Sequence, residues 1–179
     1  MDYFIRPYEK EDIPFLWEML YQSIHIPEGK ETPGREILKN PDIEKYLKDW
    51  GKKTDHALVA ADQEGDPIGA IWIRTFNKES AGYGFIDEKT PELGMAILPL
   101  YRGKGLGRQL LYKMFAASRE FGFAALSLSV DPRNSHALRL YEKSGFVKIE
   151  EDEGGSWTMK KDLATGETIK GSVDEEEIE

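Results

Sequence analysis

Residues 98–110 read Leu98-Pro99-Leu100-Tyr101-Arg102-Gly103-Lys104-Gly105-Leu106-Gly107-Arg108-Gln109-Leu110. This pattern predicts a strand, a glycine-rich turn and the first turns of a helix. The first turn of a helix has backbone N–H groups without internal partners, and the helix dipole favours anions there. The three alternating glycines leave these amides open to a ligand, and the three cations add positive charge. We therefore predict a pyrophosphate site at this turn.

Other glycine-loop interpretations fit the residues less well. A nucleotide-triphosphatase loop needs Gly-Lys-Ser/Thr, but Lys104 is followed by Gly105. A dinucleotide fingerprint needs G-x-G-x-x-G, whereas the glycines here run G-x-G-x-G without a second βαβ half. A plain tight turn before a helix needs one glycine rather than three. A phosphate loop of another kind is the interpretation that remains.

The rest of the chain predicts alternating strands and helices around this loop. Strands are expected at 3–6, 56–61, 68–76, 92–98, 125–130, 146–150 and 156–161. Helices are expected after Asp12 as N-cap, over 34–50 with a break at Pro41, over 106–121, and over 135–144 before a C-terminal cap at Gly145. Strands 92–98 and 125–130 should be parallel because a crossover helix joins them. The fold class is α/β: a central mixed, mostly antiparallel sheet with helices on both faces.

Two of the expected helices carry an apolar stripe. In the helix after Asp12 the stripe comprises Ile13, Leu16, Trp17, Leu20 and Tyr21. In the helix over 106–121 it comprises Leu106, Leu110, Met114, Ala117 and Phe121. We expect these side chains to face the sheet.

Charge is distributed unevenly along the 179 residues, whose net charge is −9. Residues 89–148 hold ten basic and four acidic residues, and both flanking segments are acidic. This balance predicts no nucleic-acid and no membrane partner, but a compact anionic ligand in the middle segment. The N-terminus shows no secretory signal, and no apolar run approaches the roughly 20 residues of a membrane helix, so a cytoplasmic location is expected.

Composition also suggests how the chain is divided. Residues 1–163 are predicted to form one domain, and 164–179 a disordered acidic tail. The sequence has no cysteine, which excludes a disulfide, a thiolate metal site and a cysteine nucleophile. His25, His56 and His136 share no metal-ligand spacing, so no metal is predicted.

The turn at 102–107 resembles the Arg/Gln-x-x-Gly-x-Gly/Ala signature of the GNAT superfamily of acetyl-CoA-dependent N-acetyltransferases. Residues 92–101 resemble that family's fourth strand, and 130–146 are similar to its fifth strand and following helix. Ile5-Arg6-Pro7 and the hairpin at 57–76 fit the rest of the fold. The resemblance covers about 1–163 and implies a GNAT-like acyl-CoA N-acyltransferase fold.

The resemblance also implies roles for residues that would contact acetyl-CoA. Backbone amides of the turn would hold the pyrophosphate, and its basic side chains would add positive charge. The residues concerned are Arg102, Gly103, Lys104, Gly105, Leu106, Gly107 and Arg108. Main-chain groups of Met95, Ile97 and Leu98 would lie along the pantetheine arm and polarise the thioester carbonyl. Asn134 would bond the pantetheine, or it caps the helix at 135.

Two residues are candidates for catalysis. Tyr141 would be the general acid that protonates the leaving thiolate; alternatively it is an aromatic residue of the helix's buried face. Glu92 would be the general base for an amine whose pKa is about 10; alternatively it is a surface carboxylate at a strand end. Asp87 and Glu88 are weaker options for the base.

The resulting functional hypothesis is direct transfer of an acetyl group from acetyl-CoA to a primary amine of a small molecule or peptide. Two alternatives are a non-catalytic acyl-CoA-binding sensor and an ATP-binding protein. In the family the acceptor enters beside segments that here contain His25, Glu28, Glu31, Tyr83, Phe85, Asp87 and Glu88. Acids mixed with aromatics suit a cationic amine, although the same composition describes an ordinary solvated loop. The resemblance leaves a homodimer open.

Overall fold

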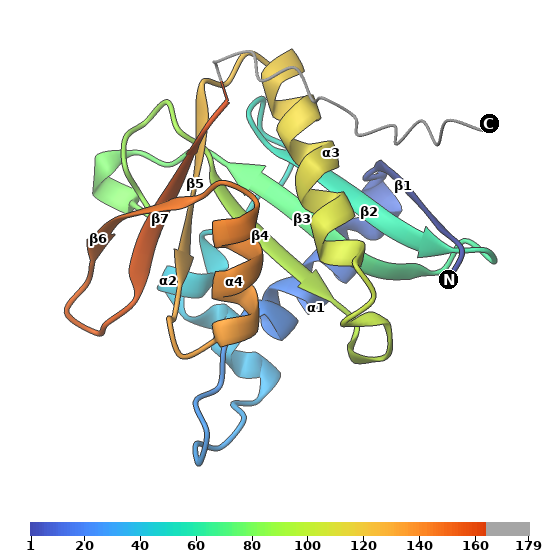
Figure 1. Cartoon of the computed structure of the whole chain (residues 1–179), viewed down its shortest axis with the longest axis horizontal. Helices are drawn as coiled ribbons and strands as arrows, with labels where there is room; N and C mark the ends of the chain where they lie inside the picture. Colours follow the sequence, from blue (N-terminus) through green and yellow to red (C-terminus); the bar gives the residue numbers. More distant parts are fainter. Residues whose placement is uncertain (164–179) are drawn as a thin grey trace, which may run out of the picture.

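A computed structural model describes residues 1–163, and the predicted acidic tail at 164–179 lies outside the described residues (Figure 1). Seven strands form one sheet in the order β1-β2-β3-β4-β5-β7-β6. They are β1 (Tyr3–Pro7), β2 (His56–Asp62), β3 (Pro67–Arg74), β4 (Glu92–Ile97), β5 (Ala125–Val130), β6 (Val147–Glu151) and β7 (Trp157–Asp162). The α-helices are α1 (Ile13–Ser23), α2 (Pro41–Glu44), α3 (Leu106–Glu120) and α4 (Ser135–Lys143). Within 1–163, no helix is both long and apolar enough to cross a membrane.

The sheet pairing confirms the predicted mixed topology. β4 and β5 are parallel, and the other neighbouring strands pair antiparallel. The β4–β5 junction is unusual, because its register contains a single pair, Glu92 with Ser127. Beyond this pair the two strands diverge, and the middle of the sheet opens.

Helices cover both faces of the sheet, as predicted: α3 and α4 lie in front of it in Figure 1, with α1 and α2 behind. Each face has its own apolar core. The front core includes Leu106, Leu110, Leu111, Met114, Phe115, Leu126, Leu128 and Tyr141. The rear core includes Leu16, Met19, Leu20, Tyr46, Leu47, Val59 and Trp72. Side chains of β4 alternate between the two, with Leu93 in the front core and Ala96 in the rear.

Three local expectations need correction. Asp12 precedes α1 but does not cap it with its side chain, because its carboxylate instead accepts from the Arg6 guanidinium at 2.6 Å and the Glu9 N–H at 2.7 Å. Phe121 is the C-cap beyond the end of α3 at Glu120, and it is exposed and stacks on His56. The segment 34–50 is a 3₁₀ turn at Arg35–Lys39 followed by the short α2, which begins at Pro41.

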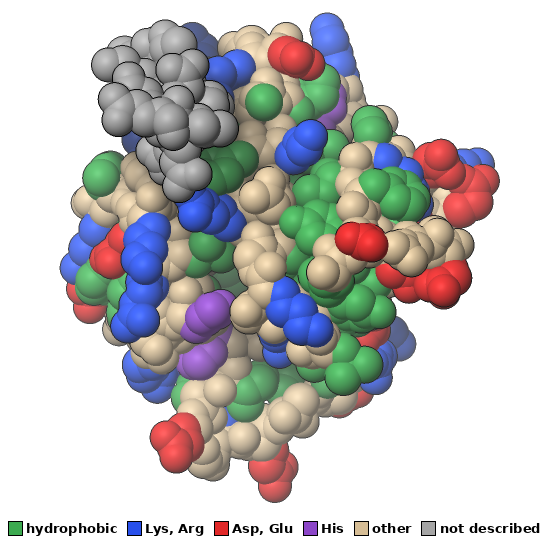
Figure 2. Space-filling model, turned by 45° about the vertical axis from the view of Figure 1, so that its right-hand side comes forward, with side chains coloured by type: hydrophobic (Ala, Val, Ile, Leu, Met, Phe, Trp, Pro, Cys, Tyr) green, Lys and Arg blue, Asp and Glu red, His purple; other side chains and the backbone are tan. Residues whose placement is uncertain are grey.

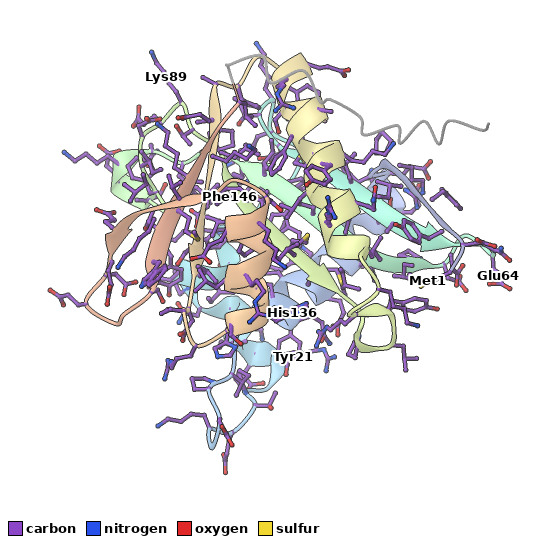
Figure 3. The ribbon with its side chains drawn as sticks, in the orientation of Figure 1. Met1, Tyr21, Glu64, Lys89, His136 and Phe146 are labelled. Carbon is purple, nitrogen blue, oxygen red and sulfur yellow. The ribbon has the colours of Figure 1, made fainter. Side chains whose placement is uncertain are left out.

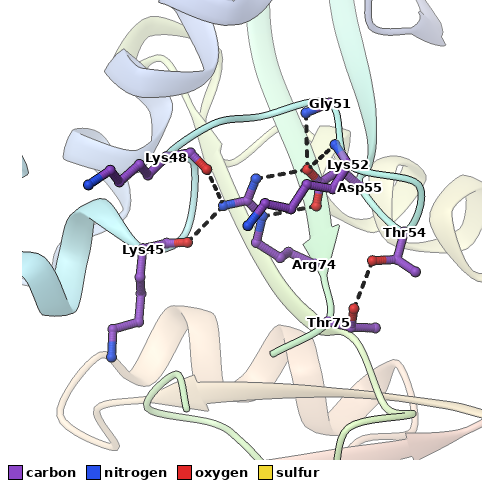
Figure 4. Close-up of polar contacts among 8 residues, drawn as sticks. All are labelled: Lys45, Lys48, Gly51, Lys52, Thr54, Asp55, Arg74 and Thr75. Carbon is purple, nitrogen blue, oxygen red and sulfur yellow. Dashed lines mark hydrogen bonds and ion pairs between the residues drawn. The ribbon is translucent and has the colours of Figure 1, made fainter. Parts of the chain in front are cut away.

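A buried ion pair fixes residues 45–55 to the sheet (Figure 4). The Arg74 guanidinium on β3 donates to both carboxylate oxygens of Asp55, at 2.9 and 2.8 Å. It also donates to the carbonyls of Lys45 and Lys48, at 2.9 and 2.7 Å. Both charged side chains are almost wholly buried, and the network holds the chain on either side of Tyr46.

We expect Arg74→Met to lower the free energy of unfolding by about 3–5 kcal/mol, because it leaves the Asp55 carboxylate buried without its charge partner. Urea denaturation followed by circular dichroism measures this loss. Arg35→Met is the matched control, because Arg35 pairs with Glu18 on the surface and its loss should have little effect. Equal unfolding midpoints for the two variants would contradict the structural role of Arg74.

Candidate active site

The opening between β4 and β5 continues into a cleft of about 1130 Å³. Its walls come from the C-terminal end of α1 and the segment after it, the whole of β4, the glycine-rich turn with the start of α3, the end of β5, and α4. The cleft therefore joins the predicted phosphate loop to the predicted catalytic residues. It is large enough to hold an extended ligand.

The glycine-rich turn has the shape expected of an anion loop, and its three glycines are required for different structural reasons. Gly103 and Gly105 have φ of 73° and 83°, in the left-handed region that favours glycine, and Gly105 is the N-cap of α3. Gly107 lies inside the first turn, where a Cβ would come within 3.1 Å of Leu140 Cδ2 on α4. The first two glycines shape the loop, and the third lets α3 pack close to α4.

Main-chain groups of β4 face the cleft at alternate residues. The Leu98 N–H donates to Ile68 O at 2.9 Å, so this amide is used by the sheet, and Leu98 does not line the cleft. Hydrogen-bond direction alternates along an antiparallel pair, so the polar groups of Met95 and Ile97 point away from β3. Ile97 O accepts from Arg102 Nε at 2.8 Å. Met95 and Ile97 thus offer main-chain groups to the cleft.

Basic side chains also line the cleft. Arg102 and Arg108 line it, whereas Lys104 lies over the Tyr101 ring and does not. The α4 residues His136, Arg139 and Lys143, three and four positions apart, also line it. Figure 2 shows Lys, Arg and His side chains around a hollow on this face. Four of the ten basic residues of the segment 89–148, Arg102, Arg108, Arg139 and Lys143, thus line the cleft.

Tyr141 and Asn134 both reach the cleft from the α4 region. Tyr141 is 9% exposed, and its ring packs edge-on against Phe146 at 5.7 Å. Burial raises the pKa of its hydroxyl to about 12, so the group keeps its proton near neutral pH. Asn134 caps α4, its Oδ1 accepting from Ala137 N–H at 3.4 Å, and it also lines the cleft. The capping role leaves Nδ2 as the atom that can donate to a ligand.

Glu92 is a buried carboxylate and not the surface carboxylate weighed as an alternative. Its side chain is 3% exposed, and it lines the cleft from the rear face of β4. Oε1 accepts from the Tyr46 hydroxyl at 2.7 Å and from Gly84 N–H at 2.8 Å. Burial raises the pKa of Glu92 to about 7, against the opposing effects of these two hydrogen bonds and of the charge on Lys45. A general base near neutral pH needs a pKa in this range.

The part of the cleft expected to bind the acceptor is lined by different residues from those that the sequence suggested. Of the seven residues expected there, only His25 and Tyr83 line the cleft. The carboxylates of Asp87 and Glu88 instead accept from backbone N–H groups of their own connecting segment. The wall is mainly aromatic and aliphatic, and it includes Leu20, Tyr21, Ile24, Ile26, Ile43, Tyr46 and Trp72. Figure 3 shows Tyr21 and His136, on opposite walls of the cleft, at the same end of the molecule.

Several of these lining residues were missed from the sequence. Tyr46 and Trp72 have no motif, and their position depends on how 41–50 and β3 pack. Arg139 and Lys143 carried a usable signal, because their spacing from His136 places all three on one side of a helix. No cluster of three or more residues suited to hold a metal ion occurs within 1–163.

The sequence pattern of the acetyltransferase (GNAT) family matches residues 17–146. The chain belongs to the GNAT family of acetyltransferases. The match covers most of α1, α2, the strands β2 to β5, the glycine-rich turn with α3, and α4, so it contains nearly every residue of the cleft.

Relatives of this GNAT acetyltransferase share a limited part of their sequence with it. The uncharacterized N-acetyltransferase YycN of Bacillus subtilis is 28% identical over 140 residues, which are 78% of this chain and 72% of YycN. The mycothiol acetyltransferase of Propionibacterium freudenreichii is 30% identical over 97 residues. The matched part is 54% of this chain and only 29% of the mycothiol enzyme.

Solved structures confirm the GNAT fold. A GNAT-family acetyltransferase from Staphylococcus aureus superposes with a TM-score of 0.66 at 17% identity, covering 90% of this chain and 99% of that one. Spermidine N-acetyltransferase from Vibrio cholerae, in complex with CoA and spermine, gives a TM-score of 0.63 at 20% identity, covering 90% and 95%. At these identities the likeness extends to the fold alone.

Proposed function

We propose that this acetyltransferase moves an acetyl group from acetyl-CoA to a primary amine of a small molecule or peptide, by direct attack of the amine while both substrates are bound. The observation that carries this proposal is the buried Glu92 at the point where β4 and β5 diverge. Its pKa of about 7 suits a general base, and it shares one cleft with a phosphate-type loop and a protonated tyrosine.

The arrangement suggests where each substrate lies. The glycine-rich turn and the α4 cations suit the phosphates of acetyl-CoA, and the outward groups of Met95 and Ile97 suit an extended pantetheine arm. Glu92 lies on the rear face of β4, whereas Tyr141 belongs to the front core. Base and acid therefore lie on opposite faces of the sheet.

The reaction needs two proton movements around one carbonyl. The amine gives a proton toward Glu92, and its nitrogen then forms a bond to the thioester carbon. When the carbon–sulfur bond breaks, Tyr141 gives its hydroxyl proton to the departing thiolate. The extra proton on the new amide nitrogen returns to Tyr141, and Glu92 releases its proton to solvent, so both side chains are restored. Because the chain has no cysteine, direct attack is simpler than transfer through a protein thiol.

A non-catalytic acyl-CoA sensor is the second candidate. Such a module needs the loop and the β4 main chain but has no use for a buried carboxylate. Keeping a carboxylate at 3% exposure is unfavourable in a folded protein unless it is compensated, so Glu92 favours the enzyme.

We expect purified protein to release free CoA thiol from acetyl-CoA only when a suitable amine is added. The panel comprises spermidine, kanamycin, lysine and a peptide with a free N-terminus, each followed by a thiol-reactive dye and by mass spectrometry of the acetylated product. Calorimetry with CoA and ATP provides the binding control. Tight CoA binding without turnover of any panel amine would favour the sensor, and preference for ATP would favour a nucleotide-binding protein.

A further inference from the structure

Glu92 has no oxygen that an amine can reach directly. Oε1 already accepts two hydrogen bonds, from the Tyr46 hydroxyl and from Gly84 N–H. Oε2 is buried without a hydrogen-bond partner in the part of the chain that the structure describes. It lies against Gly82, where even an added Cβ would collide with it. Glu92 thus lines the cleft, but one of its carboxylate oxygens is buried and the other already accepts two hydrogen bonds.

Tyr46 contacts this carboxylate and lines the same cleft. Its hydroxyl donates to Glu92 Oε1 at 2.7 Å and accepts from Tyr83 N–H at 2.8 Å, and the residue lines the cleft. A phenol oxygen donates one hydrogen bond and has two lone pairs. With one lone pair used by Tyr83, the other can accept an N–H from a ligand.

The Tyr46 side chain is held firmly in this position. It is 8% exposed, and its ring packs edge-on against Phe76 with centroids 5.2 Å apart. The carbonyl of the preceding residue, Lys45, accepts from Arg74. The Lys45 ammonium donates to Ala81 O at 3.0 Å, which ties the same turn to the chain that covers Glu92. A fixed hydroxyl between a donor and an acceptor is the geometry that proton transfer requires.

We propose that Tyr46 relays the proton of the acceptor amine to Glu92. This inference rests on the proposed function. The amine nitrogen gives a proton to the Tyr46 oxygen while the Tyr46 hydroxyl proton moves to Glu92 Oε1. The net result is a neutral amine, an unchanged tyrosine and a protonated Glu92, so no oxidant or further reactant is needed.

The charges around the pair favour concerted movement of the two protons. Burial and the nearby Glu92 carboxylate raise the pKa of Tyr46 well above its usual value, so a free tyrosinate is disfavoured. The titratable groups facing Glu92 are Tyr46 itself and Lys45, whose positive charge lowers the pKa of Glu92. The Tyr46 hydrogen bond also lowers this pKa, so removing it should raise the pKa of Glu92.

The test compares Tyr46→Phe with Tyr8→Phe. Tyr8 packs against the same rear core but does not line the cleft, so its variant reports the general effect of losing a tyrosine hydroxyl. With the fastest amine of the panel, Tyr46→Phe should lower kcat at pH 7 by a factor on the order of 10². The KM for acetyl-CoA should not change. The loss should shrink as the pH approaches about 10, where the acceptor is already a neutral amine.

A second measurement needs no acceptor. Carbon-13 NMR of labelled glutamate side chains, with Glu92 assigned from a Glu92→Gln sample, should show a higher Glu92 pKa in Tyr46→Phe than in the wild type. A kcat loss of equal size at all pH values would overturn the relay in favour of a structural role, and so would an unchanged kcat or an unchanged Glu92 titration. If the wild type turned over none of the amines in the panel, the relay and the proposed function would both be overturned. If the wild type turned over an amine and Tyr46→Phe did so equally well, the relay alone would be overturned.

Discussion

Glu92→Gln is expected to remove the rise of kcat/KM through pH 7 and to lower kcat/KM at pH 8 by a factor on the order of 10²–10⁴. The pKa of Glu92 is raised to about 7 by burial, so the group is protonated and useless as a base below that pH. Above pH 7 it is an anion that can take the amine's proton, and activity should increase. Glutamine keeps the size and the Oε1 acceptor but cannot take a proton.

The measurement is the pH dependence of thiol release between pH 5.5 and 9 for wild type and variant. Glu79→Gln serves as the matched control, because Glu79 is an exposed glutamate of the segment between β3 and β4 that does not line the cleft. If Glu92→Gln retained the rise of kcat/KM near pH 7, the general base would have to be another group.

Tyr141→Phe is expected to lower turnover by a factor on the order of 10²–10⁴ while leaving the affinity for acetyl-CoA nearly unchanged. The phenylalanine ring retains the packing against Phe146, so only the hydroxyl is lost. The pKa of Tyr141 is about 12, so the wild-type hydroxyl carries its proton throughout the working range of the enzyme and can give it to a thiolate.

Calorimetry with CoA and steady-state thiol release together separate binding from turnover for this variant. Tyr3→Phe is a suitable comparison, because Tyr3 packs against the same front core but does not line the cleft. Wild-type turnover in Tyr141→Phe would exclude the residue as general acid. A large loss of CoA affinity would show instead that the hydroxyl supports the binding of acetyl-CoA.

Local sequence patterns were sufficient to predict the elements that form the front wall of the cleft. The glycines and cations of 102–108 predicted the turn, and the β4–α3–β5 crossover predicted a parallel pair, because both depend on residues near each other in the chain. The stripe on α3 was only partly right. Leu111 and Phe115 are buried because the helix packs against a wide sheet and not against a narrow seam. Phe121 is exposed because it lies beyond the end of the helix at Glu120.

The features that make Glu92 suitable for catalysis were less accessible to sequence reasoning. The sequence suggests Glu92 by its place at a strand start, but its burial comes from Tyr46, 46 residues away in the chain, and from the backbone of 82–84. The Arg74–Asp55 pair that supports Tyr46 is equally non-local. Such contacts exist only after the rear helices have packed on the sheet, so the spacing of residues along the chain does not predict them.

The single residue pair between β4 and β5 has a consequence for how the molecule avoids aggregation. Past Glu92 and Ser127, strand β4 presents unpaired backbone groups on one side, like the edge strand of a sheet. An exposed edge invites a strand from another molecule to pair with it. Here that edge lies inside the sheet, recessed between α4 and the end of α1. A slender linear ligand can lie along it, but a second protein strand with its own neighbours cannot enter.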